Sequence, residues 1–152
     1  MHYLKDLMTK SVVTVDVTES VFNAAQIMRK ETVAALVVLE DGKPVGILTE
    51  RDLVRRVLAD NLNPVQTKVS EIMSKPLLSA NPDASIGEAA RIMVDNKIRR
   101  LPIVERDRLV GILTAVDLAR YLSKITHEIG DKVNWTETLW DAILRSSVGS
   151  NS

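Results

Sequence analysis

The sequence predicts an α+β fold in which two pseudo-symmetric β-α-β-β-α repeats pack sheet to sheet. The first observation is an internal repeat: a shift of 65 residues aligns 8–57 with 73–122 without a gap, and 17 of the 50 positions are identical. The second is a pair of segments with apolar residues at helical spacing, and the third is a set of continuous apolar runs typical of buried strands. Two copies at so long a period favour a pseudo-twofold pair over a solenoid.

Each repeat opens with the same series of predicted elements. A short approach at 4–8 or 69–73 leads to a strand at 12–15 or 77–79. A helix is then predicted at 20–30 or 85–96, because apolar residues recur at i, i+3, i+4 and i+7. Ser85 and Glu88 have the spacing of a capping box at the start of the second of these helices.

Two strands and a second helix complete each repeat. The apolar runs 35–39 and 101–104 lead through tight turns at 41–43 and 106–108 into strands at 45–48 and 109–113. The closing helix is predicted at 49–59 and 114–123. A unit of roughly 55 residues is marginally stable alone, so we expect the two units to share one core.

These elements give the domain boundaries. Repeat 1 covers 3–59, a linker covers 60–68, and repeat 2 covers 69–123. Asn61, Asn63 and Pro64 in the linker break the helix before it. A tail at 124–152 lies outside the repeat, with one or two helical turns expected at 138–145.

Composition excludes several classes of function. Twenty basic and twenty acidic residues cancel, and the pI is about 6.7. The protein therefore has no net positive electrostatic field that would attract a polyanion, and nucleic-acid binding is not expected. The chain has no Cys, which excludes disulfides, thiolate catalysis and Cys-ligated zinc. No apolar run approaches the roughly 20 residues of a membrane span. We therefore expect a cytoplasmic protein that has no membrane partner.

Catalytic and metal-binding patterns are missing from the sequence. It contains no Gly-rich phosphate loop with Lys, no nucleophile elbow and no His/acid pair at useful spacing. His2 and His127 are isolated and lack metal-ligand spacing. We predict that the protein is not an enzyme and has no catalytic residue and no metal site.

One polar motif occurs in both repeats. Gly-Ile-Leu-Thr-Glu-Arg-Asp at 46–52 returns as Gly-Ile-Leu-Thr-Ala-Val-Asp at 111–117, in each case where a buried strand runs into a helix. One interpretation is structural: Thr is an N-cap, and Asp in the first turn suits the helix dipole. The other adds a ligand, because free N–H groups gather at a helix N-terminus and an ionised Asp accepts hydrogen bonds from a vicinal diol.

Arginines distinguish the two repeats. Arg99 and Arg100 stand before the strand of repeat 2, where repeat 1 has Ala34 and Ala35. Adjacent arginines are usually solvated, but at the mouth of a buried strand they also suit bidentate contacts with phosphate. Among the charged residues of the first closing helix, only Arg51 is close enough to the motif to be a candidate site residue.

With the repeat and these motifs in place, the chain resembles the CBS-domain family, the tandem cystathionine-β-synthase domains or Bateman modules. The resemblance covers roughly 3–123 and rests on three stretches of sequence. These are the openings Leu7-Met8-Thr9 and Ile72-Met73-Ser74, the central strand at 98–104, and the closing motifs at 46–52 and 111–117. It implies two intertwined repeats, dimerisation through helices, and regulatory binding of adenosyl ligands.

The resemblance also implies two clefts, each combining the closing motif of one repeat with the opening and central strand of the other. Aspartate would hold the ribose hydroxyls, threonine would lie by the ribose or phosphate, strand residues would flank adenine, and arginine would meet phosphate. Carried onto this chain, cleft 1 takes Ile47, Thr49, Arg51, Asp52, Lys75, Pro76, Ile98, Arg99 and Arg100. Cleft 2 takes Lys10, Ser11, Val33, Ala34, Ala35, Ile112, Thr114 and Asp117.

We therefore expect a stand-alone regulatory module that binds AMP, ADP or ATP and signals to a protein partner that the sequence does not identify. It would need no cofactor and would form a homodimer. Cleft 1 has Arg99 and Arg100 near the phosphate, where cleft 2 has alanines, so we expect cleft 1 to bind phosphorylated adenosine more tightly. The alternatives are an S-adenosylmethionine sensor and a constitutive dimeric interaction protein with vestigial clefts.

Overall fold

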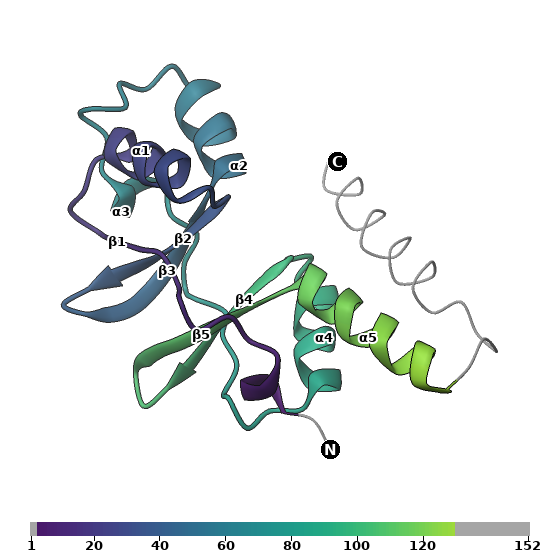
Figure 1. Ribbon diagram of the computed structural model, residues 1–152. Helices are drawn as coiled ribbons and strands as arrows, with labels where there is room; N and C mark the ends of the chain where they lie inside the picture. The colour runs from purple at the N-terminus through teal and green to yellow at the C-terminus, as the bar shows by residue number, and fades with distance from the viewer. Residues whose placement is uncertain (1–2, 130–152) are drawn as a thin grey trace. The chain divides into compact units, whose positions relative to one another are not determined.

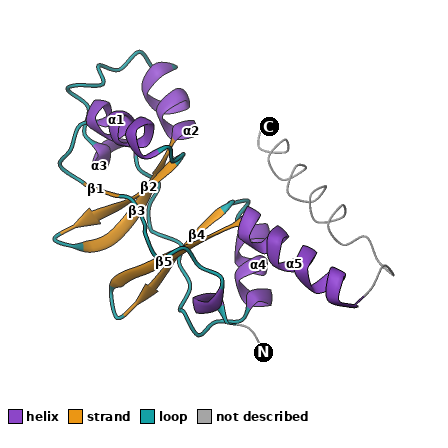
Figure 2. Ribbon diagram, in the orientation of Figure 1, coloured by secondary structure: helices purple, strands orange, loops and turns teal. Residues whose placement is uncertain are grey.

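The computed structural model describes residues 3–129 and confirms the α+β class, with helices and two small sheets (Figures 1 and 2). The predicted helical turns at 138–145 lie outside the described residues. The elements, with η for a 3₁₀- or π-helix, are η1 (Leu4–Asp6), β1 (Thr14–Asp16), α1 (Val21–Glu31), β2 (Ala35–Glu40), β3 (Lys43–Thr49), α2 (Glu50–Asp52), η2 (Leu53–Leu58), α3 (Val69–Ile72), α4 (Ile86–Asp95), β4 (Arg100–Glu105), β5 (Arg108–Thr114) and α5 (Ala115–Ile129).

Contacts between residues divide the chain into two compact units. Among the described residues, the repeat-1 unit contains 11–78 and 104–109, and the repeat-2 unit contains 3–10, 79–103 and 110–129. The compact units consequently do not coincide with the sequence repeats. Each unit combines most of one repeat with the opening segment of the other, 69–78 in the repeat-1 unit and 3–10 in the repeat-2 unit.

The repeat-1 unit is built on a three-stranded sheet in the order β1-β2-β3. β1 pairs with β2 in parallel, and β2 pairs with β3 in antiparallel orientation. The predicted tight turn between β2 and β3 is confirmed: Asp41 and Gly42 have φ values of 51° and 78°. Positive φ at both central residues is the type I′ geometry that matches the twist of a two-stranded hairpin.

Helices α1, α3 and the continuous helix α2–η2 lie on the same side of this sheet (Figure 1). Helix α1 begins directly after the N-cap Ser20, whose hydroxyl accepts the N–H of Asn23, close to the predicted start. Alternate residues of β2, Leu36 and Val38, reach the core because side chains two apart share a face of a strand. The buried cluster consists of Val15, Val21, Ala24, Met28, Leu36, Val38, Leu48, Val57, Val69 and Ile72.

The second sheet has two strands, β4-β5, which belong to the repeat-2 unit except for the hairpin tip at 104–109. The strand predicted at 77–79 is therefore wrong. In its place the structure has one isolated parallel bridge between Ala80 and Ile103. Figure 2 shows the chain before α4 as a loop.

Prolines explain the missing strand. In repeat 1 the amides of Val17 and Val37 donate hydrogen bonds of 2.9 and 3.2 Å at the two ends of the β1–β2 pairing. The residues 65 positions later are Pro82 and Pro102, which have no N–H to donate. The pairing of the second repeat is therefore reduced to a single bridge.

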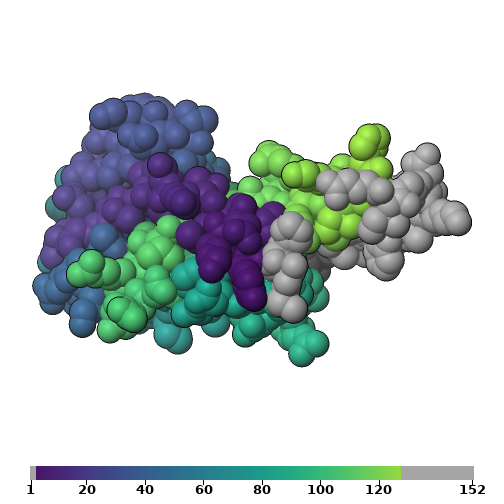
Figure 3. Space-filling view, turned by 60° about the horizontal axis from the view of Figure 1, so that its bottom comes forward, coloured from purple at the N-terminus to yellow at the C-terminus, as the bar shows by residue number. Residues whose placement is uncertain are grey.

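The repeat-2 unit has its own buried cluster. Helix α4 begins after Ser85, whose hydroxyl accepts the N–H of Glu88 at 3.1 Å, so the serine half of the predicted capping box is present. The N-terminal segment packs against the start of α4, where the Leu4 amide donates to the Ala84 carbonyl (Figure 3). The cluster consists of Leu4, Ala80, Ala89, Met93, Leu101, Ile103, Leu113 and Leu118.

Both predicted closing helices are present, but they differ from each other. The first contains the π-helix η2, in which the Ala59 amide donates to the Val54 carbonyl five residues earlier. The second, α5, continues six residues past the predicted end at 123, because no Gly or Pro interrupts it before Gly130. None of the helices within 3–129 is long and apolar enough to cross a membrane.

Candidate functional site

The first closing motif joins the end of β3 to the start of α2 through reciprocal hydrogen bonds. The amide and the hydroxyl of Thr49 donate to Asp52 Oδ2 at 2.9 and 3.0 Å, and the Asp52 amide donates to Thr49 Oγ1 at 3.2 Å. This arrangement is a capping box. The structural interpretation of the motif is therefore confirmed at this junction.

The second closing motif repeats this geometry. The Thr114 amide donates to Asp117 Oδ2 at 2.9 Å, and the Asp117 amide donates to Thr114 Oγ1 at 3.1 Å. Both threonines end a β-strand, so the same backbone turn fixes both carboxylates.

In each motif the aspartate divides its two oxygens between two environments. Oδ2 serves the cap, while Oδ1 faces an arginine: Asp52 Oδ1 lies 3.9 Å from Arg56 Nε, and Asp117 Oδ1 lies 3.7 Å from Arg120 Nη1. These separations exceed hydrogen-bond lengths. The carboxylates are largely covered, with 13% of each aspartate side chain exposed. Each junction thus presents one carboxylate oxygen that the cap does not use.

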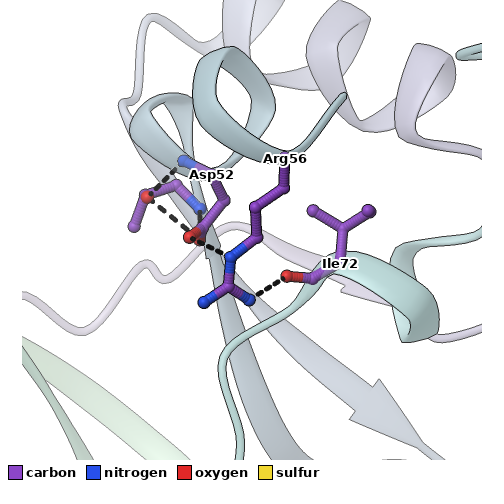
Figure 4. Close-up of polar contacts among 4 residues, drawn as sticks. Asp52, Arg56 and Ile72 are labelled. Carbon is purple, nitrogen blue, oxygen red and sulfur yellow. Dashed lines mark hydrogen bonds and ion pairs between the residues drawn. The ribbon is translucent and has the colours of Figure 1, made fainter. Parts of the chain in front are cut away.

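Arg56 also binds the backbone of the opening segment of repeat 2, a role that the sequence did not indicate. Its Nη1 donates to the carbonyl oxygen of Ile72 at 2.8 Å (Figure 4). Ile72 ends α3 and is buried. The signal that could have found Arg56 is its i+4 spacing from Asp52, which places the two side chains on one helix face.

The opening segments approach the closing strands closely at two glycines. A Cβ on Gly46 would lie 2.8 Å from the Ser74 carbonyl oxygen and 2.9 Å from Met73 Sδ. A Cβ on Gly111 would lie 2.5 Å from Met8 Sδ. Glycine inside a strand often marks such an approach.

Backbone pairing at these glycines brings several predicted site residues together. Ile47 pairs with Ser74 through bonds of 3.1 and 2.9 Å, so Lys75 and Pro76 follow directly beside the first motif. In the repeat-2 unit Ile112 pairs with Thr9 through two bonds of 2.9 Å, and Lys10 follows.

The remaining predicted residues lie at the ends of helices and strands. Arg99 is exposed and Arg100 half-buried, and the Arg99 carbonyl accepts the Ala115 amide at 2.8 Å in the repeat-2 unit. The Ala34 carbonyl accepts the Glu50 amide at 3.0 Å in the repeat-1 unit. The others are Ser11, Val33 and Ala35 of the repeat-1 unit, Ile98 of the repeat-2 unit and the exposed Arg51 of α2.

A pocket of about 330 Å³ adjoins the second motif within the repeat-2 unit. A volume of this size is at the lower end of the range for small-molecule sites. Apart from Asp117, its residues were not predicted. They are Asp6, Leu7, Asp117, Arg120, Tyr121, Lys124 and Ile125.

A larger open pocket of about 460 Å³ lies between β1 and α1 in the repeat-1 unit and contains none of the predicted residues. It includes Asp16, whose carboxylate accepts the hydroxyl and the amide of Thr18 at 2.7 and 3.0 Å. These two hydrogen bonds lower the pKa of Asp16, because they stabilise its charged form. Asp16 is exposed, unlike the largely covered Asp52 and Asp117, so we assign no ligand to the pocket.

Metal-ligating groups do not gather at either motif. Within residues 3–129 no three His, Asp or Glu side chains are grouped so that they could hold a metal ion. Arginine cations, rather than further carboxylates, stand beside Asp52 and Asp117. This pattern suits an organic or anionic ligand better than a cation.

Comparison with known proteins identifies both repeats. The family described as "CBS domain" matches residues 4–59 and again 69–124. The CBS domain-containing protein YhcV of Bacillus subtilis is 43% identical over 119 residues, which cover 78% of this chain and 84% of that protein. Two longer archaeal relatives, from Methanopyrus kandleri and Methanocaldococcus jannaschii, are covered over 57% and 31% of their length.

Two solved structures show related folds. The CBS domain pair of protein MJ0100, solved in complex with 5′-methylthioadenosine and S-adenosyl-L-methionine, is 29% identical with a TM-score of 0.74. The match covers 82% of this chain and 98% of that one. A hexameric CBS-CP12 protein from bloom-forming cyanobacteria is 26% identical with a TM-score of 0.70, over 97% of this chain and 94% of that one.

Proposed function

This chain belongs to the CBS-domain family, and from that premise we propose that it is a regulatory module that binds an adenosyl nucleotide at each closing motif. The proposed ligands are AMP, ADP or ATP. The module would not be a catalyst; it would pass its ligand state to a partner protein. Tandem CBS domains generally have this kind of regulatory role.

The observation that carries the proposal is the divided carboxylate of each motif. In Asp52 and in Asp117 the cap holds Oδ2 and so fixes the carboxylate. Oδ1 makes no hydrogen bond to the cap and faces an arginine. The two adjacent hydroxyls of a ribose are donors that a fixed, largely covered carboxylate oxygen can accept. A hydrogen bond to a charged acceptor contributes about 1.5–3 kcal/mol.

Two further features favour an adenosyl ligand with phosphate. The ligands named for the MJ0100 pair share a 5′-thioadenosine group, which supports adenosyl binding in general. The cations Lys75 and Lys10 directly follow Ser74 and Thr9, the residues of the opening segments that pair with the strands of the two motifs. Arg99 and Arg100 have no charged counterparts in repeat 1, so the tighter binding of phosphorylated adenosine at the Asp52 site remains our prediction.

Calorimetry with AMP tests the proposal. We expect Asp52→Ala to remove the tighter binding event and Asp117→Ala to remove the weaker one, because each substitution deletes one ribose acceptor. Asp60→Ala, an exposed acid of the linker, is the control and is expected to leave both events unchanged. If Asp117→Ala removed the tighter event, the assignment of the two sites would be reversed.

A constitutive interaction protein is the second candidate function. It is favoured by apolar side chains that the repeat-1 unit leaves exposed at Phe22, Val54, Leu58, Leu62 and Val65.

A ligand at 100 times its Kd raises the free energy of unfolding by about 2.7 kcal/mol. Thermal unfolding with millimolar AMP, ATP and S-adenosylmethionine therefore separates the candidates: a shift with none of them would favour the interaction protein, and a shift with S-adenosylmethionine alone would favour that sensor.

A further inference from the structure

Arg56 connects two parts of the repeat-1 unit that the proposed site uses. One guanidinium nitrogen, Nε, faces Asp52 Oδ1 at 3.9 Å, and another, Nη1, donates to the Ile72 carbonyl at 2.8 Å (Figure 4). Two residues beyond Ile72, Ser74 pairs with Ile47 of β3. A single side chain thus links the motif carboxylate to the segment that leads into Lys75.

The backbone around Arg56 gives this link its geometry. Arg56 lies within the π-helix η2, whose turns are wider than those of an α-helix. The Ile72 carbonyl is at the end of α3, where no later residue of the helix can donate to it. The planar guanidinium presents several donors in a rigid fork, so it can satisfy this carbonyl and face the carboxylate at the same time.

The second repeat has a different residue at the position of Arg56. The residue that matches Arg56 is Tyr121, and Asp117 instead faces Arg120, which comes three residues later on the regular helix α5. Arg120 has 76% of its side chain exposed, compared with 51% for Arg56. The arginine beside Asp117 is therefore more exposed to solvent than the one beside Asp52.

We propose that Arg56 is a positioning residue for the ligand site at Asp52. It holds the Asp52 carboxylate in register with the 72–76 segment, so that the ribose acceptor and the opening segment are already arranged when a ligand arrives. The inference rests on the proposed function, because it assigns Arg56 a part in the same site. Without Arg56, the ligand would have to order the carboxylate and the 72–76 segment itself, and the lost conformational entropy would reduce its binding free energy.

This role differs from that of a phosphate-binding arginine in a measurable way. A residue that orients the ribose acceptor affects every ligand with a ribose, whether or not the ligand has a phosphate. A residue that contacts phosphate affects AMP and leaves adenosine unchanged. The two ligands therefore separate positioning from direct contact.

The test is calorimetry with adenosine and with AMP in an Asp117→Ala background, where only the Asp52 site remains. We expect Arg56→Gln to weaken binding of both ligands by the same factor, about 3- to 10-fold, as for the loss of one hydrogen bond. Arg56→Lys keeps the charge but not the fork, and is expected to recover only part of this loss. The matched control is Arg120→Gln in the wild-type chain. It should leave the affinity of the Asp52 site unchanged for both ligands.

Coupling to Asp52 separates a positioning role from a general loss of stability. If Arg56 acts through the carboxylate, adding Arg56→Gln to Asp52→Asn causes little further loss of affinity, because the effects of coupled residues are not additive. Unchanged binding in Arg56→Gln, or weaker binding of AMP alone, would overturn the inference while leaving the proposed function intact. Failure of the wild-type chain to bind either ligand would overturn both.

Discussion

Single carboxylates perform two tasks at the closing motifs. Oδ2 of Asp52 and of Asp117 completes a capping box, and Oδ1 faces an arginine across a largely covered site. Loss of a helix cap typically costs about 0.5–2 kcal/mol. Substitution of either aspartate therefore lowers stability as well as any affinity for a ligand, and its effect on binding should be measured well below the unfolding temperature.

Gly46 is a residue at which a single added methyl group is expected to lower stability. In Gly46→Ala the new Cβ would meet the Ser74 carbonyl oxygen at 2.8 Å, a backbone atom that is fixed by its pairing with Ile47. We expect the free energy of unfolding to fall by about 1–3 kcal/mol, as for other overpacked positions. Urea denaturation followed by circular dichroism measures the change.

Gly87 provides the matched control for this substitution. It lies in α4, and a Cβ there would meet nothing within 4 Å. Because alanine is the better helix former by up to about 1 kcal/mol, Gly87→Ala should leave stability unchanged or raise it. Equal effects of the two substitutions would contradict a specific close approach at Gly46.

At the scale of elements, the two hairpins use one backbone conformation with different residues. The β2–β3 turn is Asp41-Gly42, and the β4–β5 turn is Arg106-Asp107, with φ values of 50° and 62°. Glycine adopts positive φ without steric cost, whereas a residue with a Cβ does not. The second hairpin is therefore closed by the less suitable pair of residues.

Exchange of the matching residues Gly42 and Asp107 tests this interpretation. We expect Asp107→Gly to raise the free energy of unfolding by about 0.5 kcal/mol and Gly42→Asp to lower it by at least as much. The effect is modest because Asp is among the residues that tolerate this region. Thermal unfolding of both variants is the measurement, and a loss of stability in Asp107→Gly would show that the turn is not strained.

At the scale of the whole molecule, the repeat-1 unit leaves a set of apolar side chains outside its core. Val54 and Leu58 stand one turn apart on η2, and Phe22 donates its amide to the Pro64 carbonyl, next to the exposed Val65. Grouped exposed apolar residues often mark interaction surfaces. They motivate the homodimer that we propose for this chain.

A charge at Leu58 tests the dimer. Leu58 is 75% exposed, so Leu58→Lys should cost the monomer little, whereas a buried lysine in an apolar interface is strongly unfavourable. We expect the mass measured by light scattering after gel filtration to fall from that of a dimer to that of a monomer. Gln26→Lys, an exposed residue of α1, is the control and should leave the mass unchanged. A wild-type chain that is already monomeric would refute the proposed dimer.

Local patterns in the sequence determined most of the elements and the chemistry of the motifs. The helices after Ser20 and Ser85, the central hairpins and the two Thr-x-x-Asp junctions could all be predicted, because each depends on residues within a few positions of one another. The repeat itself was visible because the two copies retain the same buried side chains. The missing strand before α4 was also encoded, by Pro82 and Pro102, but only comparison with the pairing in repeat 1 shows what those prolines remove.

The tertiary structure decided which distant segments share a unit, a pairing that no local pattern indicated and that only the family resemblance implied. The opening segment of each repeat packs on the closing strand of the other, at Gly46 and Gly111, so the compact units exchange segments that the sequence places 65 residues apart. The contact between Arg56 and Ile72 depends on this exchange and on a π-helix. The spacing of apolar residues along a short segment is enough to predict a helix or a strand. A contact between distant segments cannot be predicted in this way, because it depends on how the whole chain pairs its backbone groups and fills its core.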